Sequence, residues 1–160
     1  MAERAEEVGR LLTNQGRSIA VAESLTGGML ASELAKAERA SDWFRGGVVA
    51  YASEVKHDLL DVPRGPVVSE EAALAMATSV ARVLGADLGA AVTGVGGPGP
   101  QDGEPPGTVW AAVHDRDGTD ATLLRLEGDP AEICDQTCAA VLDLVASRLL
   151  AGAPAASADR

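Results

Sequence analysis

Three side chains in the first third of the chain could form a hydrolytic site. Ser24 stands in the segment 22–28, Ala-Glu-Ser-Leu-Thr-Gly-Gly, and Tyr51 and Lys56 lie five residues apart further along the chain. A serine hydroxyl is a weak nucleophile until a neighbouring base removes its proton. A lysine can be that base if its pKa falls from about 10.4 towards about 7–8, whereas an arginine stays protonated. We therefore predict that Lys56 activates Ser24, and that Tyr51 relays the proton or holds the lysine.

The residues after Ser24 could stabilise the negative charge that develops in such a reaction. Thr26, Gly27 and Gly28 follow the serine at a point where a strand is expected to turn into a helix. Glycines leave the turn without side chains, so backbone N–H groups at the helix start can face an oxyanion or a phosphate. We expect Thr26, Gly27 and Gly28 to contact the substrate. The alternative is that Ser24 only caps the helix.

Hydrophobic patterns predict the elements that position these residues. They indicate helices over residues 3–15, 26–37, 53–60, 69–84 and 130–150, and strands over 18–22, 46–51, 87–93, 108–114 and 119–126. This alternation predicts an α/β fold, a three-layer α/β/α sandwich with a mixed, mostly parallel five-stranded sheet. We expect one domain over residues 1–150 and a disordered tail over 151–160. Ligands bind at the carboxyl ends of strands in such sheets, so Ser24, Tyr51 and Thr93 should share one rim.

The position of Lys56 on its predicted helix favours a neutral amine. Ser53 is expected to cap this helix, which places Lys56 in the first turn. The N-terminal end of a helix carries partial positive charge and therefore disfavours an ammonium group. Lys56 is also one of only two lysines among 13 basic residues. The alternative is an ordinary surface lysine.

The composition argues against two classes of partner. The formal net charge is −11, and the chain has only four aromatic residues. An acidic surface repels nucleic-acid backbones and anionic lipids, and a platform for single strands usually needs several aromatic side chains. We therefore expect no nucleic-acid and no membrane partner. Without a secretion signal or an apolar run of about 20 residues, the expected location is the cytoplasm.

A long segment rich in glycine and proline follows the third predicted strand. Residues 94–99 match the G-x-G-x-x-G pattern of dinucleotide-binding sites, but the four prolines between 98 and 106 prevent the helix which that pattern requires. A long loop without regular structure is uncommon in a compact domain and is often functional. We predict that it forms one wall of the pocket and that Thr93, Gly94 and Gly96 contact the substrate. The alternative is a loop in solvent.

The histidines and cysteines do not suggest a metal site. His57 and His114 stand far apart in the sequence, and Cys134 and Cys138 lack the neighbouring ligands that zinc requires. We expect both histidines at the surface, both cysteines as small core residues, and no metal or cofactor. A Ser/His site remains the alternative to the Ser/Lys site.

These segments together resemble the CinA C-terminal domain family, whose free-standing members are nicotinamide-nucleotide amidohydrolases. The resemblance covers about residues 5–150 and rests on segments 22–28, 43–47, 68–69, 93–98 and 106–110, with Tyr51 and Lys56. It implies that Ser24 is the nucleophile and that Tyr51 and Lys56 complete the site. The implied reaction converts nicotinamide mononucleotide into nicotinate mononucleotide and ammonia without a metal. The resemblance also implies a three-layer α/β/α fold and a homodimer or larger homo-oligomer.

Two departures from the family pattern concern substrate contacts. Residues 51–53 read Tyr-Ala-Ser where the family usually has Tyr-Ser-Asn, and Pro130 and Cys134 stand where it usually has arginines. If those arginines bind the phosphate, Arg125 or Arg45 would have to replace them. Two alternatives therefore stay open. The chain could be a non-catalytic nucleotide- or partner-binding module of the same fold, or a Ser/Lys hydrolase of another small amide.

Overall fold

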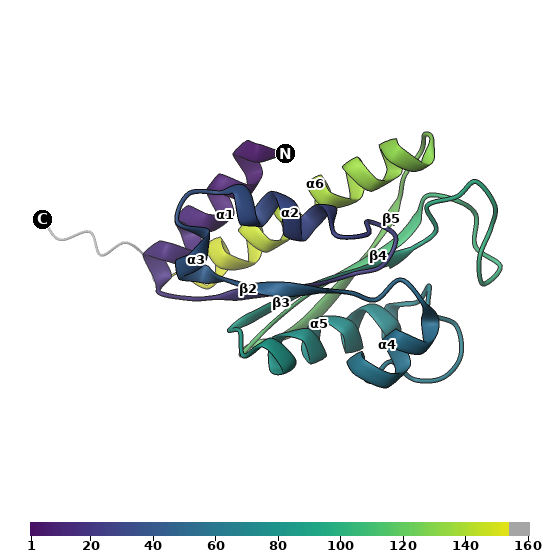
Figure 1. Ribbon diagram of the computed structural model, residues 1–160, viewed down its shortest axis with the longest axis horizontal. Coiled ribbons are helices and arrows are strands. Elements are labelled where there is room, and N and C mark those ends of the chain that lie inside the picture. The colour runs from purple at the N-terminus through teal and green to yellow at the C-terminus, as the bar shows by residue number, and fades with distance from the viewer. Residues whose placement is uncertain (154–160) are drawn as a thin grey trace, which may run out of the picture.

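The computed structural model describes residues 1–153, which form a five-stranded sheet between two layers of helices (Figure 1). The strands are β1 (Ile19–Glu23), β2 (Phe44–Val49), β3 (Leu88–Gly94), β4 (Thr108–Asp115) and β5 (Gly118–Arg125), and their order across the sheet is β2-β1-β3-β4-β5. β1 pairs in parallel with β2 and β3, whereas β4 is antiparallel to both of its neighbours. This architecture confirms the predicted fold class.

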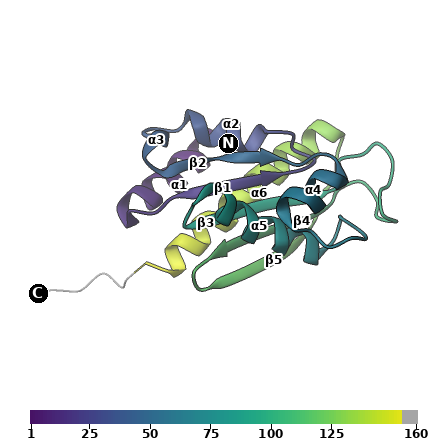
Figure 2. The same ribbon diagram turned by 60° about the horizontal axis from the view of Figure 1, so that its bottom comes forward.

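The helices cover both faces of the sheet. α1 (Ala2–Gln15), α2 (Met29–Lys36), α3 (Ala40–Trp43) and α6 (Pro130–Ala151) lie on one side, and α4 (Ser53–Leu60) and α5 (Glu70–Leu84) lie on the other (Figures 1 and 2). None of the helices within residues 1–153 is long and apolar enough to span a membrane.

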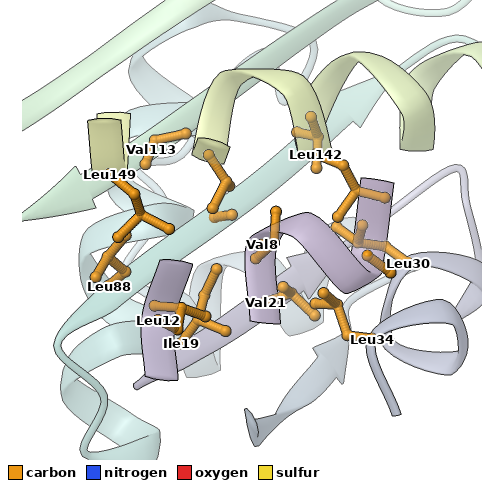
Figure 3. Packing of buried hydrophobic residues seen from close by; sticks show 14 of the residues in the cluster. Val8, Leu12, Ile19, Val21, Leu30, Leu34, Leu88, Val113, Leu142 and Leu149 are labelled. Carbon is orange, nitrogen blue, oxygen red and sulfur yellow. The ribbon is translucent and has the colours of Figure 1, made fainter. Parts of the chain in front are cut away.

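Large aliphatic side chains fill the space between the sheet and the layer formed by α1, α2, α3 and α6 (Figure 3). Successive side chains of a strand point to opposite faces, so each central strand contributes every second residue to this layer. The strand and helix residues that meet there include Val8, Leu12, Ile19, Val21, Leu30, Leu34, Leu88, Leu142 and Leu149. This well-filled core holds β1 and α2 in place, and the turn between them carries Ser24.

The opposite face of the sheet is lined by small residues. Its strand side chains are mainly alanines, namely Ala20, Ala22, Ala91 and Ala112. A Cβ atom on Gly89 would lie only 2.0 Å from the carbonyl oxygen of Ala77 on α5. The small side chains therefore allow α5 to approach the strands closely.

Two local predictions were wrong. β2 runs over Phe44–Val49 and not over residues 46–51. Its residues alternate between half-buried and exposed, because β2 is an edge strand of the sheet. Ala52, not Ser53, is the N-cap of α4, and no side chain caps this helix. α6 ends at Ala151, within one residue of its expected end, and residues 154–160 of the predicted tail lie outside the described residues.

The predicted starts of the last two helices are confirmed. The Ser69 side chain accepts a hydrogen bond from the Ala72 N–H at the start of α5. At the start of α6, Asp129 and Glu132 form a reciprocal capping box and Pro130 occupies the first turn. These side chains satisfy N–H groups that would otherwise lack an acceptor, which explains why the helices begin there.

Candidate active site

The predicted site residues gather where β1, β2 and β3 end, at the right-hand edge of the sheet in Figure 1. Ser24 directly follows β1, Tyr51 lies two residues beyond β2, and Thr93 is near the end of β3. The Glu23 carbonyl oxygen accepts a hydrogen bond of 2.7 Å from the Ala50 N–H, which continues the β1–β2 pairing past the strand ends. The structure therefore places all three residues at one rim, as the sequence predicts.

A buried carboxylate shapes the turn that holds Ser24. Glu23 is fully buried and accepts hydrogen bonds from the Thr26 hydroxyl at 2.6 Å, the Leu30 N–H at 2.8 Å and the Ala31 N–H at 2.9 Å. The negative charge at the start of α2 also interacts favourably with the helix dipole. The sequence analysis gave Glu23 no role. The signal was an acidic residue three positions before Thr26, just ahead of a helix.

Several backbone N–H groups of this turn are free to bind an anion. Those of Gly27 and Met29 are used within the turn itself. Those of Leu25, Thr26 and Gly28 have no hydrogen-bond acceptor among residues 1–153. Gly27 and Gly28 have φ angles of 57° and 104°, a left-handed conformation that glycine adopts without strain. The three free N–H groups are the candidates for an oxyanion hole.

The Ser24 hydroxyl is free to act as a nucleophile. Ser24 is 7% exposed, and its side-chain oxygen makes no hydrogen bond within residues 1–153. Every buried side-chain nitrogen or oxygen in this part of the chain has a hydrogen-bond partner. The unbonded Ser24 oxygen must therefore retain some exposure to solvent.

Lys56 is almost completely buried close to the end of β2. It is 1% exposed, and its Nζ donates a hydrogen bond of 3.1 Å to the Tyr51 carbonyl oxygen. Burial lowers the pKa of Lys56, while the negative charge of Asp102 acts in the opposite direction. Desolvation therefore moves this amine towards the neutral form that a base requires.

Ser24 and Lys56 are connected through the backbone and not by a direct hydrogen bond in this structure. Lys56 donates a hydrogen bond to the Tyr51 carbonyl. Ala50, the residue before Tyr51, donates its N–H to the carbonyl of Glu23, the residue before Ser24. Hydrogen bonds between catalytic groups are often long without substrate and shorten in the productive complex.

The Tyr51 phenol is not part of the buried site in this structure. Its residue is 72% exposed, and the contact with Lys56 is made by its backbone carbonyl. The early end of β2 places Tyr51 outside the sheet. The predicted proximity to Lys56 is present, but the backbone of Tyr51 provides it.

The three residues predicted to contact the substrate from the end of β3 have different surroundings. Thr93 is buried, and its hydroxyl donates a 2.7 Å hydrogen bond to the Val67 carbonyl oxygen. A Cβ atom on Gly94 would lie 2.6 Å from a β4 carbonyl oxygen, so this glycine permits strand pairing. A Cβ atom on Gly96 would lie 3.9 Å from the Leu25 Cβ. Of the three, Gly96 lies directly beside the serine turn.

Asp102, in the long loop after β3, is a further residue of this region that was not predicted from the sequence. Its carboxylate accepts hydrogen bonds from the Val67 and Val68 N–H groups at 2.9 and 3.0 Å. The available signal was the Asp-Gly pair at 102–103, since aspartate tolerates the left-handed conformation found here at φ 51°.

The two arginines considered as phosphate ligands lie away from Ser24. Arg45 donates a 3.0 Å hydrogen bond to the Leu84 carbonyl at the end of α5, near the amino end of β2 and thus at the opposite rim. Arg125 ends β5, three strands from β1 or about 14 Å at the usual strand spacing. Cys134 on α6 is closer, because its thiol donates a 3.3 Å hydrogen bond to the Leu25 carbonyl.

The two cysteines and two histidines differ in their surroundings. Cys138 is fully buried, and burial raises the pKa of its thiol to about 12, while Cys134 is half-buried and its pKa is also raised by burial. Both histidines are half-buried, and each Nδ1 has a hydrogen-bond partner, so their predicted surface placement is only partly right. Within residues 1–153, no three His, Cys, Asp or Glu side chains are grouped so that they could hold a metal ion.

Comparison with known sequences identifies one family. The family described as the CinA C-terminal domain matches residues 1–149. A CinA-like protein of Frankia casuarinae is 45% identical over 149 residues, which are 90% of this chain and 34% of that protein. A putative competence-damage inducible protein of Desulforamulus reducens is 40% identical over 148 residues, 89% of this chain and 36% of that protein. The chain thus spans about a third of the length of these relatives.

Solved structures show the same fold over the whole domain. The competence damage-inducible protein A of Klebsiella pneumoniae is 31% identical, with a TM-score of 0.91 over 95% of this chain and 98% of that one. The competence/damage inducible protein of Agrobacterium tumefaciens is 29% identical, with a TM-score of 0.84 over 92% of this chain and 96% of that one.

Proposed function

Because the chain belongs to the CinA C-terminal domain family, we propose that it is an amidohydrolase that converts nicotinamide mononucleotide into nicotinate mononucleotide and ammonia. The observation that supports this proposal most is the buried Lys56, an amine with a lowered pKa at the same rim as an unbonded serine hydroxyl. A fully buried lysine is rare unless it is paired or has a chemical task.

The proposed reaction has two stages. The Ser24 oxygen attacks the carboxamide carbon while its proton passes to neutral Lys56, and the oxyanion is bound by the free N–H groups of Leu25, Thr26 and Gly28. The C–N bond then breaks, Lys56 gives the proton to the departing nitrogen, and ammonia leaves an ester on Ser24. Water attacks this ester with Lys56 again as base, which releases the carboxylic acid and restores the serine. Tyr51 assists by holding the amine.

Replacement of the two central residues tests the proposal. Ser24→Ala and Lys56→Met should each abolish ammonia release from nicotinamide mononucleotide while the circular dichroism spectrum stays unchanged. Lys36→Met is the matched control, because Lys36 is the other lysine of the chain and is exposed. Unchanged turnover in either site variant would refute the role of that residue.

A second candidate substrate is a small amide without a phosphate. It is favoured by the positions of Arg45 at the opposite rim and Arg125 about 14 Å away, because neither arginine considered as a phosphate ligand then lies beside the serine turn. Ammonia release should be compared for nicotinamide mononucleotide, the riboside and nicotinamide. Release only from an uncharged or cationic amide would support this candidate, and binding without release would support a non-catalytic module. The homo-oligomer implied by the family resemblance is likewise a proposal, tested by the molar mass of the chain in solution.

A further inference from the structure

Asp102 is the one residue of the loop over 95–107 whose side chain bonds to the segment between α4 and α5, within the described residues. Its Oδ2 accepts the Val67 N–H at 2.9 Å and the Val68 N–H at 3.0 Å. Hydrogen bonds to a charged acceptor are about twice as strong as those between neutral groups. The residue adopts a φ of 51°, a left-handed conformation that aspartate tolerates.

These bonds belong to a set of hydrogen bonds from Asp102 and Thr93 to the segment at Val67, which we call the clasp. The Thr93 hydroxyl donates to the Val67 carbonyl at 2.7 Å, on the other side of the same peptide segment. The segment is thereby held both by the end of β3 and by the loop. It follows α4, whose own end is fixed because the Val62 N–H donates to the Lys56 carbonyl at 3.1 Å. The clasp therefore fixes the segment that follows α4, the helix that carries Lys56.

Asp102 is itself exposed, and it is also the carboxylate whose negative charge raises the pKa of Lys56. Glu54 and Asp58 on the same helix are exposed, and both are paired with Arg64. Glu70 and Glu71 at the start of α5 are exposed, and on the loop Glu104 is half-buried. Besides burial, the influence on the pKa of Lys56 comes from Asp102, whose negative charge raises it.

We propose that Asp102 is a positioning residue for Lys56: its carboxylate pins the 95–107 loop against Val67 and Val68 and thereby holds a counter-charge near the buried amine. The role of this pair in amide hydrolysis rests on the proposed function, but the hydrogen bonds of Asp102 to Val67 and Val68 do not. Asp102 acts through Lys56 and is assigned no contact with the substrate.

Two substitutions distinguish the effect of the Asp102 hydrogen bonds from the effect of its negative charge. In Asp102→Asn the amide oxygen can still accept the two N–H groups, while the negative charge is lost. In Asp102→Ala both are lost. Glu104→Gln is the matched control, because it removes one negative charge from the same loop without removing a side-chain hydrogen bond of the described structure.

The titration of Lys56 can be observed directly. The chain has only two lysines, so biosynthetic labelling with lysine carrying 13C at Cε gives two NMR signals, and exposed Lys36 is the internal reference. Since the Asp102 charge raises the pKa of Lys56, its removal in Asp102→Asn should move the Lys56 titration to lower pH. Lys36 should not move in any variant, and Lys56 should not move in Glu104→Gln. A Lys56 titration that is unchanged in Asp102→Asn would overturn the proposal.

Kinetics provide the second readout. The acid limb of the kcat/KM profile should move to lower pH in Asp102→Asn, because more Lys56 is neutral at a given pH. Asp102→Ala should in addition lower kcat/KM by roughly tenfold or more, since a released loop no longer holds the site in register. Equal pH profiles and equal kcat/KM in both variants and the wild type would contradict the positioning role. If the wild type releases no ammonia but the Lys56 signal shifts in Asp102→Asn, the proposed function fails and the electrostatic effect of Asp102 on Lys56 stands.

Discussion

Two fully buried ionisable side chains near the serine turn have opposite hydrogen-bond environments. Glu23 receives three hydrogen bonds, two of them from backbone N–H groups of α2. Lys56 donates one, to a backbone carbonyl. A buried charge with several partners stabilises a structure, whereas an amine with one neutral acceptor is poorly compensated as an ammonium ion. Glu23 thus suits an architectural role and Lys56 suits proton transfer.

We predict that Glu23→Gln destabilises the domain by about 2 kcal/mol, because a carboxamide offers one acceptor oxygen and turns its NH₂ group towards an N–H donor. The midpoint of urea unfolding measures this loss. Glu7→Gln on the exposed side of α1 is the control and should change stability by less than about 0.5 kcal/mol. Equal midpoints for the two variants would show that the Glu23 carboxylate is not a structural element.

Residue types predicted the nucleophile and base candidates, but not their partners. Ser24 and Lys56 could be chosen because few residues can act as nucleophile or base, and both lie at the expected rim. Asp102 could not be found in this way, because its contacts depend on the path of a loop without a periodic pattern. The exposure of Tyr51 depends on where an edge strand ends, which hydrophobicity does not determine.

At the scale of elements, periodicity and capping residues predicted the order of the main helices and all five strands. The short helix α3 was missed, since Ala40–Trp43 is a single turn and has no measurable periodicity. The face that each helix covers, and the close approach of α5 to the strands, follow from long-range packing. Those contacts fix which loops meet at the site.

A network of charged side chains joins the β4–β5 hairpin to α6, at the end of the sheet where the neighbouring strand β3 begins. Arg148 donates to both carboxylate oxygens of Asp115 at 3.0 and 2.6 Å and also bonds to Asp120 and to the Gly118 carbonyl. The hydrogen bond from Arg148 lowers the pKa of buried Asp115 from 3.8 to about 2. A carboxylate with a lowered pKa stabilises the folded state above its unfolded pKa, and this contribution disappears as the pH falls from about 4 to about 2.

We therefore expect Asp115→Asn to lower the free energy of unfolding by about 2 kcal/mol at pH 7, the equivalent of the shift in pKa. Its stability should also depend less on pH between about 4 and 2 than that of the wild type. Urea unfolding from pH 2.5 to 7 measures both effects. Asp117→Asn, an exposed change in the same hairpin turn, is the control. A loss of stability on acidification that is as steep in Asp115→Asn as in the wild type would contradict this assignment.

At the scale of the whole molecule, the dominant property is the net charge of −11. The relatives and solved structures establish the family and the fold, and the fold places Ser24 and Lys56 at one rim. The net charge then influences which charged ligands approach the domain, because long-range fields raise or lower their local concentration.

The net charge predicts opposite salt effects for two related substrates. Near neutral pH, nicotinamide mononucleotide combines a cationic ring with a phosphate and is a net anion, whereas the riboside is a cation. An acidic protein repels the first and attracts the second, and salt screens both interactions. Raising ionic strength from about 20 to about 200 mM should therefore raise kcat/KM for the mononucleotide by about threefold and lower it for the riboside. Uncharged nicotinamide is the control and should show no change in kcat/KM. A fall in kcat/KM for the mononucleotide with added salt would mean that a local group of cations binds its phosphate and outweighs the net charge of the chain.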